Sequence, residues 1–280
     1  RVLRPLDRVA AAVEKRSPAL LEPLAESGLP HEVRPLVGAL NGLLGRLGHA
    51  LDAQRTFIAD AAHELRTPLT AVHLQAQLAE RATGEPERRA ALADLKGGLE
   101  RATRLVEQLL TLAREEPGVA DRPPAAVDLA ALGREVVTDL APLAAAKRID
   151  LGLNAEPGVQ VPGDPDALTT LLSNLVDNAL RYTPEGGRVD VGVAVDGAHP
   201  VLSVRDSGPG IAEADRERVF RRFVRGSAAG DAVRGSGLGL SIVKRIAERH
   251  RADIRVGAGL DGAGAGISVR FPPPEATPPA

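Results

Sequence analysis

The segment at residues 63–68 places an imidazole, a carboxylate and a hydroxyl on one helix-forming stretch, as His63, Glu64 and Thr67. A neutral imidazole is a competent nucleophile near neutral pH. A carboxylate that accepts the Nδ1 proton leaves the Nε2 lone pair free and stabilises the positive charge that develops as the ring bonds to phosphorus. Thr67, four residues after His63, shares its helical face and can hydrogen-bond a water or a phosphate oxygen. An isolated His-Glu pair would more often be an incidental part of a solvated helix face. The complete motif favours an imidazole that acts as a nucleophile.

A second group of polar side chains recurs along one face of a later predicted helix. Asn174, Asn178 and Arg181 follow one another at steps of four and three residues, on a helix whose other face is apolar. Two amide oxygens and a cation arranged in this way suit Mg²⁺ bound to a polyphosphate, because Mg²⁺ prefers oxygen ligands and retains waters. Taken alone, the stripe is equally compatible with an ordinary solvent-facing surface.

Two glycine-rich loops follow that helix. Asp206–Gly210 comes after a predicted strand, and a carboxylate there can accept an exocyclic amino group while glycines let the backbone approach a ligand. Gly235–Leu240 opens a predicted helix, whose amides and positive end can hold phosphates. Each loop alone is weak evidence, since such sequences more often form turns. Between them, Arg216–Asp231 has the composition of a mobile lid, with three arginines that could reach phosphate: Arg221, Arg222 and Arg225.

The helices that must position the histidine show a heptad repeat. Apolar residues in the first predicted helix include Val2, Leu6, Val9 and Val13. The second carries a seam with alternating steps of four and three: Leu36, Leu40, Leu43, Leu47, Ala50, Gln54, Phe57 and Ala61. With Ala61 on the seam, His63 turns roughly 200° away and is exposed.

Pro68 follows five residues after His63 and cannot donate to the carbonyl of Glu64, so we expect a kink or local loosening there. Residues 81–90 then predict a polar turn. A further helix repeats the heptad: Leu92, Leu95, Leu99, Ala102, Val106, Leu109 and Ala113. Two antiparallel helices cannot bury both seams by themselves, so the pattern predicts a dimer that forms a four-helix bundle.

These patterns predict a multidomain chain: an all-α dimeric helical bundle followed by a domain of mixed helices and strands. We place helices at 1–50, the histidine-bearing hairpin at 51–117, a linker at 118–126, a mixed α/β domain at 127–272 and a disordered tail at 273–280. Within the mixed domain we expect these elements: helices at 129–146, 166–181 and 237–249, and strands at 149–153, 159–161, 188–195, 201–205 and 267–271.

Composition limits the class of protein. The 280 residues have a net charge of -2, no cysteine and 2% aromatic residues. No basic tract interleaved with aromatics is present, so we expect no nucleic-acid partner. No apolar run approaches the roughly 18 residues that span a bilayer. Because the chain starts at Arg1 and lacks methionine, we expect it to be the cytoplasmic portion of an inner- or plasma-membrane protein whose N-terminal region is absent.

Taken together, these blocks resemble the sensor histidine kinases of bacterial two-component systems over nearly the whole chain. The five motifs occur in the family's order: His63–Leu69 resembles the H box, Asn174–Tyr182 the N box, Asp206–Gly210 the first G box, Val219–Phe223 the F box and Gly235–Leu240 the second G box. Residues 1–50 resemble, more loosely, a HAMP signal-relay unit. The resemblance implies a dimerisation and phosphotransfer hairpin. It also implies that the ATP-binding domain is an α/β sandwich with three helices over a mixed sheet, as in gyrase, heat-shock chaperone and mismatch-repair ATPases.

The resemblance also implies roles for single residues. Asn178 would ligate Mg²⁺ with Asn174 beside it, Tyr182 would pack near the adenine, and Asp206 would accept the adenine amino group. Arginines would contact the phosphates: Arg181, which stands where lysine is frequent, and Arg225. The remaining ATP-binding residues would come from the G boxes: Gly208, Gly210, Gly235, Gly237, Leu238 and Gly239. In the related ATPases a water-activating glutamate occupies the position of Asn174, and an amide cannot act as that base.

The implied activity is that of an ATP:protein-histidine phosphotransferase working as a homodimer. His63 would be phosphorylated from Mg²⁺–ATP and would then pass the phosphate to an aspartate of a separate response regulator. Thr67 makes a reverse, phosphatase activity compatible with the motif. Two alternatives stay open: a relay scaffold that binds ATP without catalysis, and a regulator whose phosphatase activity dominates.

Overall fold

The computed structural model describes residues 24, 31, 33–114, 125–224 and 236–273. The chain divides into two compact units, Arg1–Thr70 and Ala71–Ala280. The boundary falls within helix α2 (Arg34–Arg81), and Pro68 lies inside this helix. The kink or loosening expected at Pro68 remains a prediction. The helix predicted near residues 2–13 and the tail at 274–280 lie outside the described residues.

In the first unit, the beginning of α2 packs against the segment that precedes it. Leu24, Val33 and Val37 are buried together, and Leu40 packs against them. Asn41 stabilises this contact with two hydrogen bonds. Its Oδ1 accepts from the Leu24 amide (2.6 Å), and its Nδ2 donates to the Leu24 carbonyl (3.0 Å). One apolar face of α2 is therefore covered within the chain.

A second apolar face of α2 stays exposed. Leu36, Leu43 and Leu47 lie on the predicted heptad seam and are 60%, 53% and 47% exposed. Val37, one residue after Leu36, is fully buried. The predicted seam is thus divided: Leu36, Leu43 and Leu47 have no covering element among the described residues, whereas Leu40 packs within the chain.

In the second unit, α2 ends at Arg81 and α3 (Glu85–Arg114) begins after a short turn. The turn predicted at 81–90 was too long, because charged residues assigned to it form the first turn of α3. Glu85 and Glu87 lie near the positive end of that helix, where carboxylates are favourable. Glu85 also forms ion pairs with Arg88 and Arg89.

Most of the buried residues of helix α3 are small. Ala91, Gly98, Ala102 and Leu105 are buried, whereas three residues of the predicted seam are 41–52% exposed: Leu92, Leu99 and Val106. As in α2, the predicted seam is divided: Ala102 is covered within the chain, whereas Leu92, Leu99 and Val106 are not.

Gly98 lets helix α3 approach Val72 of helix α2 closely, whereas the neighbouring Gly97 has no such contact. A methyl group at position 98 would come within 2.9 Å of Val72 Cγ2, whereas one at 97 would meet only the guanidinium end of Arg101, at 3.3 Å. Replacing glycine by alanine inside a helix stabilises it by about 1 kcal/mol. Gly97→Ala should therefore raise the urea midpoint of the helical circular-dichroism signal, and Gly98→Ala should lower it or leave it unchanged. Equal increases in both variants would exclude a close approach at Gly98.

The rest of the second unit is a mixed α/β domain. Its strands are β1 (Ala125–Asp128), β2 (Asp150–Ala155), β3 (Gln160–Gly163), β4 (Arg188–Asp196), β5 (His199–Asp206), β6 (Asp253–Ala258) and β7 (Ala265–Arg270). Its helices are α4 (Leu129–Ala146), α5 (Pro165–Tyr182) and α6 (Gly239–Arg249), with 3₁₀ turns η1 (Glu213–Asp215), η2 (Arg218–Phe220) and η3 (Leu260–Gly262).

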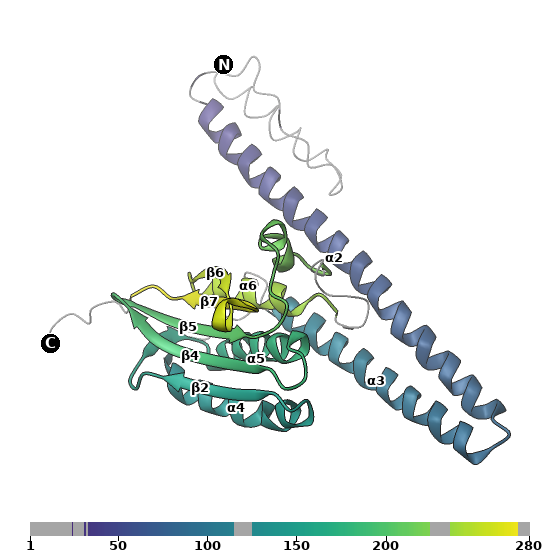
Figure 1. The fold of residues 1–280 in the computed structure, drawn as a ribbon. Helices are drawn as coiled ribbons and strands as arrows, with labels where there is room; N and C mark the ends of the chain where they lie inside the picture. Colours follow the sequence, from purple (N-terminus) through teal and green to yellow (C-terminus); the bar gives the residue numbers. More distant parts are fainter. Residues whose placement is uncertain (1–23, 25–30, 32, 115–124, 225–235, 274–280) are drawn as a thin grey trace. The chain divides into compact units, whose positions relative to one another are not determined.

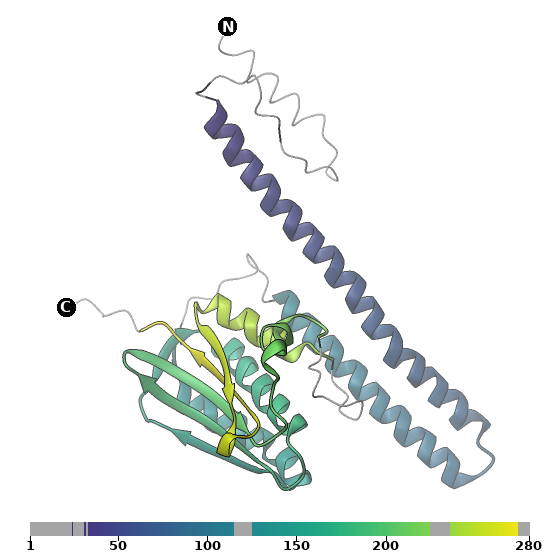
Figure 2. The ribbon, with the colours of Figure 1, turned by 45° about the horizontal axis from the view of Figure 1, so that its top comes forward.

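Five strands form the main sheet in the order β2-β4-β5-β7-β6, and β1 pairs with β3 in a separate ribbon. The pair β2–β4 is parallel, and the other neighbours in the main sheet are antiparallel. Helices α4, α5 and α6 cover one face of this sheet (Figures 1 and 2). The predicted α/β sandwich with three helices over a mixed sheet is confirmed.

Helix α5 is the centre of this layer because its apolar stripe is fully buried. Leu168, Leu171, Leu172 and Val176 are each 0% exposed. The helix starts where Asp164 accepts a hydrogen bond from the amide of Asp166, and Pro165 occupies its first turn, where no amide is needed. Its opposite, polar stripe is thereby turned away from the core.

Two strands are absent from the sequence prediction. Strand β1 begins at Ala125, so the last two residues of the predicted linker, 125 and 126, belong to a strand. Strand β6 lies at the edge of the main sheet, pairs with β7 alone and is largely exposed. A four-residue ribbon strand and an exposed edge strand carry too little apolar alternation to be recognised.

Candidate functional site

A cavity lies among α5, the loop after β5 and the start of α6. Of the predicted ATP-binding residues that the structure describes, these line it: Asn174, Asn178, Arg181, Tyr182, Asp206, Gly210, Gly237 and Gly239. Residues from three separate sequence motifs therefore meet in one concave site.

The orientation of Asn174 is set by its own helix. Its Nδ2 donates to the carbonyl of Thr170 at 2.8 Å, which leaves Oδ1 directed away from that carbonyl. A methyl group on Gly239 would come within 3.1 Å of this Oδ1. Asn174 thus presents an acceptor beside the first residue of α6, and a side chain at position 239 would crowd this oxygen.

Arg181 forms an ion pair inside the cavity. Its Nη2 donates to Asp177 Oδ2 at 2.7 Å, one helical turn earlier, and Asp177 also lines the cavity. Sequence reasoning missed Asp177. Its four-residue spacing from Arg181 was the available signal, since oppositely charged side chains at that spacing are neighbours on a helix.

Asp206 is the buried carboxylate of the site, 7% exposed. Its Oδ1 accepts from the amides of Gly208 (2.8 Å) and Ala265 (3.1 Å). Burial raises the pKa of Asp206 above its ordinary value, and the two amide bonds oppose that rise. Because both bonds end on Oδ1, the carboxylate is held in one orientation, with Oδ2 as the acceptor left for a ligand.

The start of α6 offers backbone amides to the cavity. The N-cap residue of this helix is Leu238, whose apolar side chain offers no capping hydrogen bond. Leu238 is fully buried beneath it, and Ser236 Oγ accepts from the Leu238 amide (3.3 Å). Gly237 has φ +70°, and a side chain there would strike the backbone of Phe223, whose amide donates to the Gly237 carbonyl (3.0 Å). An uncapped helix start of this kind is suited to phosphate.

Some predicted site residues have other positions or cannot be placed. Gly208 contributes its amide to Asp206 rather than a cavity wall, and Leu238 anchors α6 from within the core. Gly235 and Arg225 lie outside the described residues. Sequence reasoning also missed several lining residues: Gln108, Pro209, Ile211, Asp215, Val219 and Ser236. Gln108 has no local signal, because it reaches this site from α3 and accepts from Ser236 Oγ at 2.7 Å.

The histidine motif lies in the first unit, on α2. His63 and Thr67 are exposed and Glu64 is half-buried. The predicted exposure of the imidazole is therefore observed along this helix.

Three protein families match successive parts of the chain. Residues 3–49 match the "Sensor protein PhoQ-like, HAMP domain", residues 53–118 the "His Kinase A (phospho-acceptor) domain", and residues 163–276 the "Histidine kinase-, DNA gyrase B-, and HSP90-like ATPase". The sensor protein kinase PmrB of Pseudomonas aeruginosa is 43% identical over 281 residues. The chain belongs to the sensor histidine kinases.

The chain spans a little over half the length of the curated relatives that it matches. The match to PmrB covers 100% of this chain and 58% of PmrB. The sensor protein QseC of Escherichia coli is 42% identical over 265 residues, which are 94% of this chain and 58% of QseC.

Solved structures of the same class share the fold. The Acinetobacter baumannii histidine kinase AdeS matches with a TM-score of 0.61 at 24% identity, over 75% of this chain and 96% of AdeS. ShkA, solved in complex with AMPPNP, matches with a TM-score of 0.58 at 30% identity, over 81% of this chain and 47% of ShkA.

Proposed function

We propose that this chain binds Mg²⁺–ATP in the cavity beside α5 and transfers the γ-phosphoryl group to His63. The observation that carries the proposal is the buried, oriented carboxylate of Asp206 in a cavity that also presents Asn178, Arg181 and an uncapped helix start. The carboxylate can accept a hydrogen bond from the amino group of ATP, and the cation and the free amides can bind its phosphates.

Within this cavity, Asp206 Oδ2 accepts the amino group of adenine and Tyr182 packs near the ring. Arg181 exchanges its ion pair with Asp177 for phosphate oxygens, which are also negatively charged. The glycines at 210, 237 and 239 give the nucleotide close access to backbone, and Arg225 adds a further cation. The complex of ShkA with AMPPNP supports an adenine nucleotide as the ligand class.

The residues present fit a magnesium ion. Asn178, with Asn174 beside it, supplies amide oxygens, and the neighbouring Asp177 is a carboxylate; all three line the cavity. Mg²⁺ takes such oxygen ligands together with waters and phosphate oxygens. When bound, it neutralises charge on the phosphates.

In the transfer step, the Nε2 lone pair of His63 forms a bond to the γ-phosphorus. The bond from that phosphorus to the bridging oxygen breaks, and ADP leaves with the electron pair. Glu64 accepts a hydrogen bond from Nδ1–H, so the proton stays at Nδ1 and the positive ring is stabilised. Positioning and charge neutralisation account for most of the catalysis. An amide at Asn174 cannot activate water, which favours transfer to histidine over hydrolysis.

The acting form is a homodimer. Exposed apolar side chains continue along both hairpin helices: Ile58, Leu69, Leu74, Leu78, Leu92, Leu99, Val106 and Leu110. Burying them between two copies completes a four-helix bundle.

No helix in the described parts of the chain is long and apolar enough to cross a membrane. We place the chain on the cytoplasmic side of a membrane sensor, with residues 1–50 passing the signal to the histidine helix and a response-regulator aspartate receiving the phosphate.

The direct test is incubation of the chain with γ-labelled ATP and Mg²⁺. Acid-labile, alkali-stable label on the protein supports histidine phosphorylation. ATP binding without any label would instead support the relay scaffold.

Thr67 provides a test of the reverse activity. Its hydroxyl is exposed on the helical face of His63, where it can hold a water for attack on a regulator's phosphoaspartate. Thr67→Ala should leave autophosphorylation intact and slow regulator dephosphorylation by about tenfold, the effect of one lost hydrogen bond in the transition state. Thr70→Ala is the matched control, because that hydroxyl is also exposed on α2 but donates to the Arg66 carbonyl (2.8 Å). Equal dephosphorylation rates in both variants and the parent would remove Thr67 from the mechanism.

A further inference from the structure

The C-terminal end of α5 is held by a lysine from a different helix. Lys147 directly follows α4, and its Nζ donates to the carbonyl oxygens of Leu180 (2.8 Å) and Arg181 (3.1 Å). Both carbonyls belong to the last turn of α5, where a helix leaves its carbonyls without intrahelical partners. An ammonium group at this end also opposes the negative end of the helix dipole.

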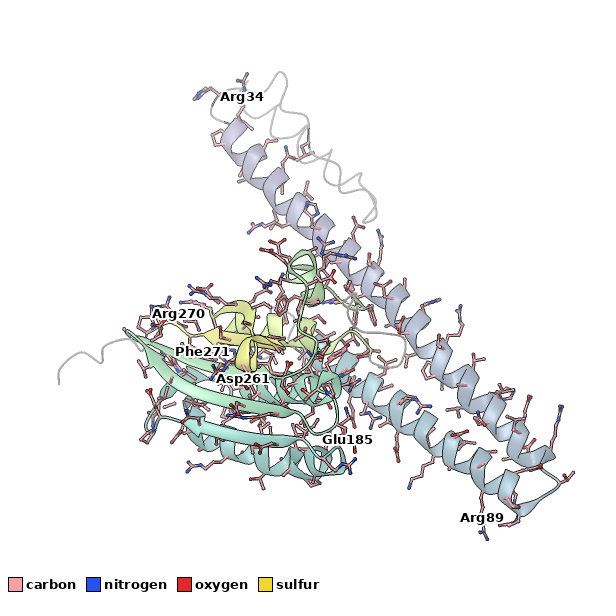
Figure 3. The ribbon with its side chains drawn as sticks, in the orientation of Figure 1. Arg34, Arg89, Glu185, Asp261, Arg270 and Phe271 are labelled. Carbon is pink, nitrogen blue, oxygen red and sulfur yellow. The ribbon has the colours of Figure 1, made fainter. Side chains whose placement is uncertain are left out.

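The next residue makes a contact of a different kind. Arg148 forms an ion pair with Glu185, which Figure 3 labels on the turn that follows α5. The two side chains are 76% and 59% exposed, so solvent screens the pair and it contributes little. The amide of Asp150 donates to the Gly187 carbonyl (2.9 Å), which joins the same two turns through the backbone. Lys147 differs from Arg148 because its bonds are partly buried and end on helix carbonyls.

The turn that Lys147 holds carries two side chains of the cavity. Arg181 and Tyr182 line the cavity, whereas Lys147 is not among its lining residues in the described part of the chain. The backbone from Leu180 to Tyr182 sets where the guanidinium and the phenol ring can lie. Without the lysine, the two carbonyls would lose charged donors, and the last turn of α5 would be free to fray.

We propose that Lys147 is a positioning residue for nucleotide binding, which acts by fixing the last turn of α5 so that Arg181 and Tyr182 meet ATP in one geometry. The proposal rests on the ATP binding proposed above. It assigns part of the affinity for ATP to a side chain that does not touch the ligand.

The test compares Lys147→Met with the parent chain. Methionine keeps a long apolar stem and removes the three donors and the charge. We expect the Kd for Mg²⁺–ATP to rise by about tenfold, the effect of one lost hydrogen bond to a charged group. The autophosphorylation rate at saturating ATP should stay largely unchanged. A purely structural role would instead lower the melting temperature and the active fraction while leaving Kd unchanged, and that result would overturn the proposal.

Tyr182 supplies a second, local readout. It is the single tyrosine of a chain that contains no tryptophan, so tyrosine fluorescence reports the held turn alone. In Lys147→Met this signal should change at temperatures well below the loss of far-ultraviolet circular dichroism. An unchanged tyrosine signal would show that the last turn of α5 does not depend on the lysine.

Two further variants separate the possible causes. Lys147→Arg retains donors and charge and should restore most of the affinity. Arg148→Met removes the neighbouring exposed ion pair and should leave Kd and the tyrosine signal at parent values. Equal weakening by Lys147→Met and Arg148→Met would attribute the effect to general loosening of both turns and overturn the proposal. A parent chain that binds no ATP would overturn the proposed function itself, whereas a parent that binds while Lys147→Met binds equally well would overturn this inference alone.

Discussion

Replacing His63 by alanine is expected to abolish transfer of label from γ-labelled ATP while ATP binding is retained. The exposed imidazole is the proposed nucleophile, and alanine has no group that can bond to phosphorus. Label incorporation should fall by more than about a thousandfold, because removing a nucleophile leaves only the contributions of binding and positioning. The measurement is acid-labile, alkali-stable label on the protein, together with the Kd for ATP.

His73 supplies the matched control, because it is another exposed histidine on α2. His73→Ala should accept label at the parent rate. Label that persists in His63→Ala would mean that a different side chain is the acceptor. Loss of ATP binding in His63→Ala would mean that the substitution disturbs more than the acceptor.

The second large effect is expected at Asp206, where function and stability should change in opposite directions. In Asp206→Asn, the side-chain oxygen can still accept from the amides of Gly208 and Ala265. The new NH₂ group then replaces the acceptor at Oδ2 and meets the amino group of adenine, donor against donor. We expect the affinity for ATP to fall by about a hundredfold, which corresponds to roughly 3 kcal/mol for a lost hydrogen bond and an unsatisfied donor.

GTP distinguishes this explanation from general damage to the site. Guanine carries a carbonyl oxygen where adenine carries an amino group, so the amide of Asp206→Asn can donate to it. The preference for ATP over GTP should therefore decrease in the variant. An equal loss of both nucleotides would indicate that the cavity itself has been disturbed.

The stability of the same variant follows from burial. Burial raises the pKa of Asp206 in the folded state, so its protonated form contributes stability that is present below the unfolded-state pKa and is lost as pH rises through the folded-state pKa. At neutral pH the parent carries a buried carboxylate, and Asp206→Asn should melt at a higher temperature. The difference should vanish in acid, where the carboxyl group is protonated and resembles the amide. A variant that melts below the parent at neutral pH would show that the hydrogen bonds from the amides of Gly208 and Ala265 to the carboxylate outweigh the effect of burial.

Local sequence determined the helices, most strands and the polar stripe of the site. The repeat of buried leucines along α5 fixes which face of that helix enters the core, and Asn174, Asn178 and Arg181 follow on the opposite side by helical geometry alone. The order of motifs in the chain was also sufficient for the family. These features depend on residues within a few turns of one another, and periodicity reports such relations directly.

Tertiary structure alone decided which distant groups complete the site. Asp206 is oriented by the amide of Ala265 on β7, 59 residues away, because the strand order places β7 beside β5. Lys147 reaches the end of α5 across 33 residues for a similar reason: α4 and α5 lie together on one face of the sheet. Along α2, the sequence identified one apolar seam but not that Leu40 on it packs within the chain while Leu36 and Leu43 stay exposed. Burial and hydrogen bonding between distant segments depend on where the fold brings them, and no local period encodes that.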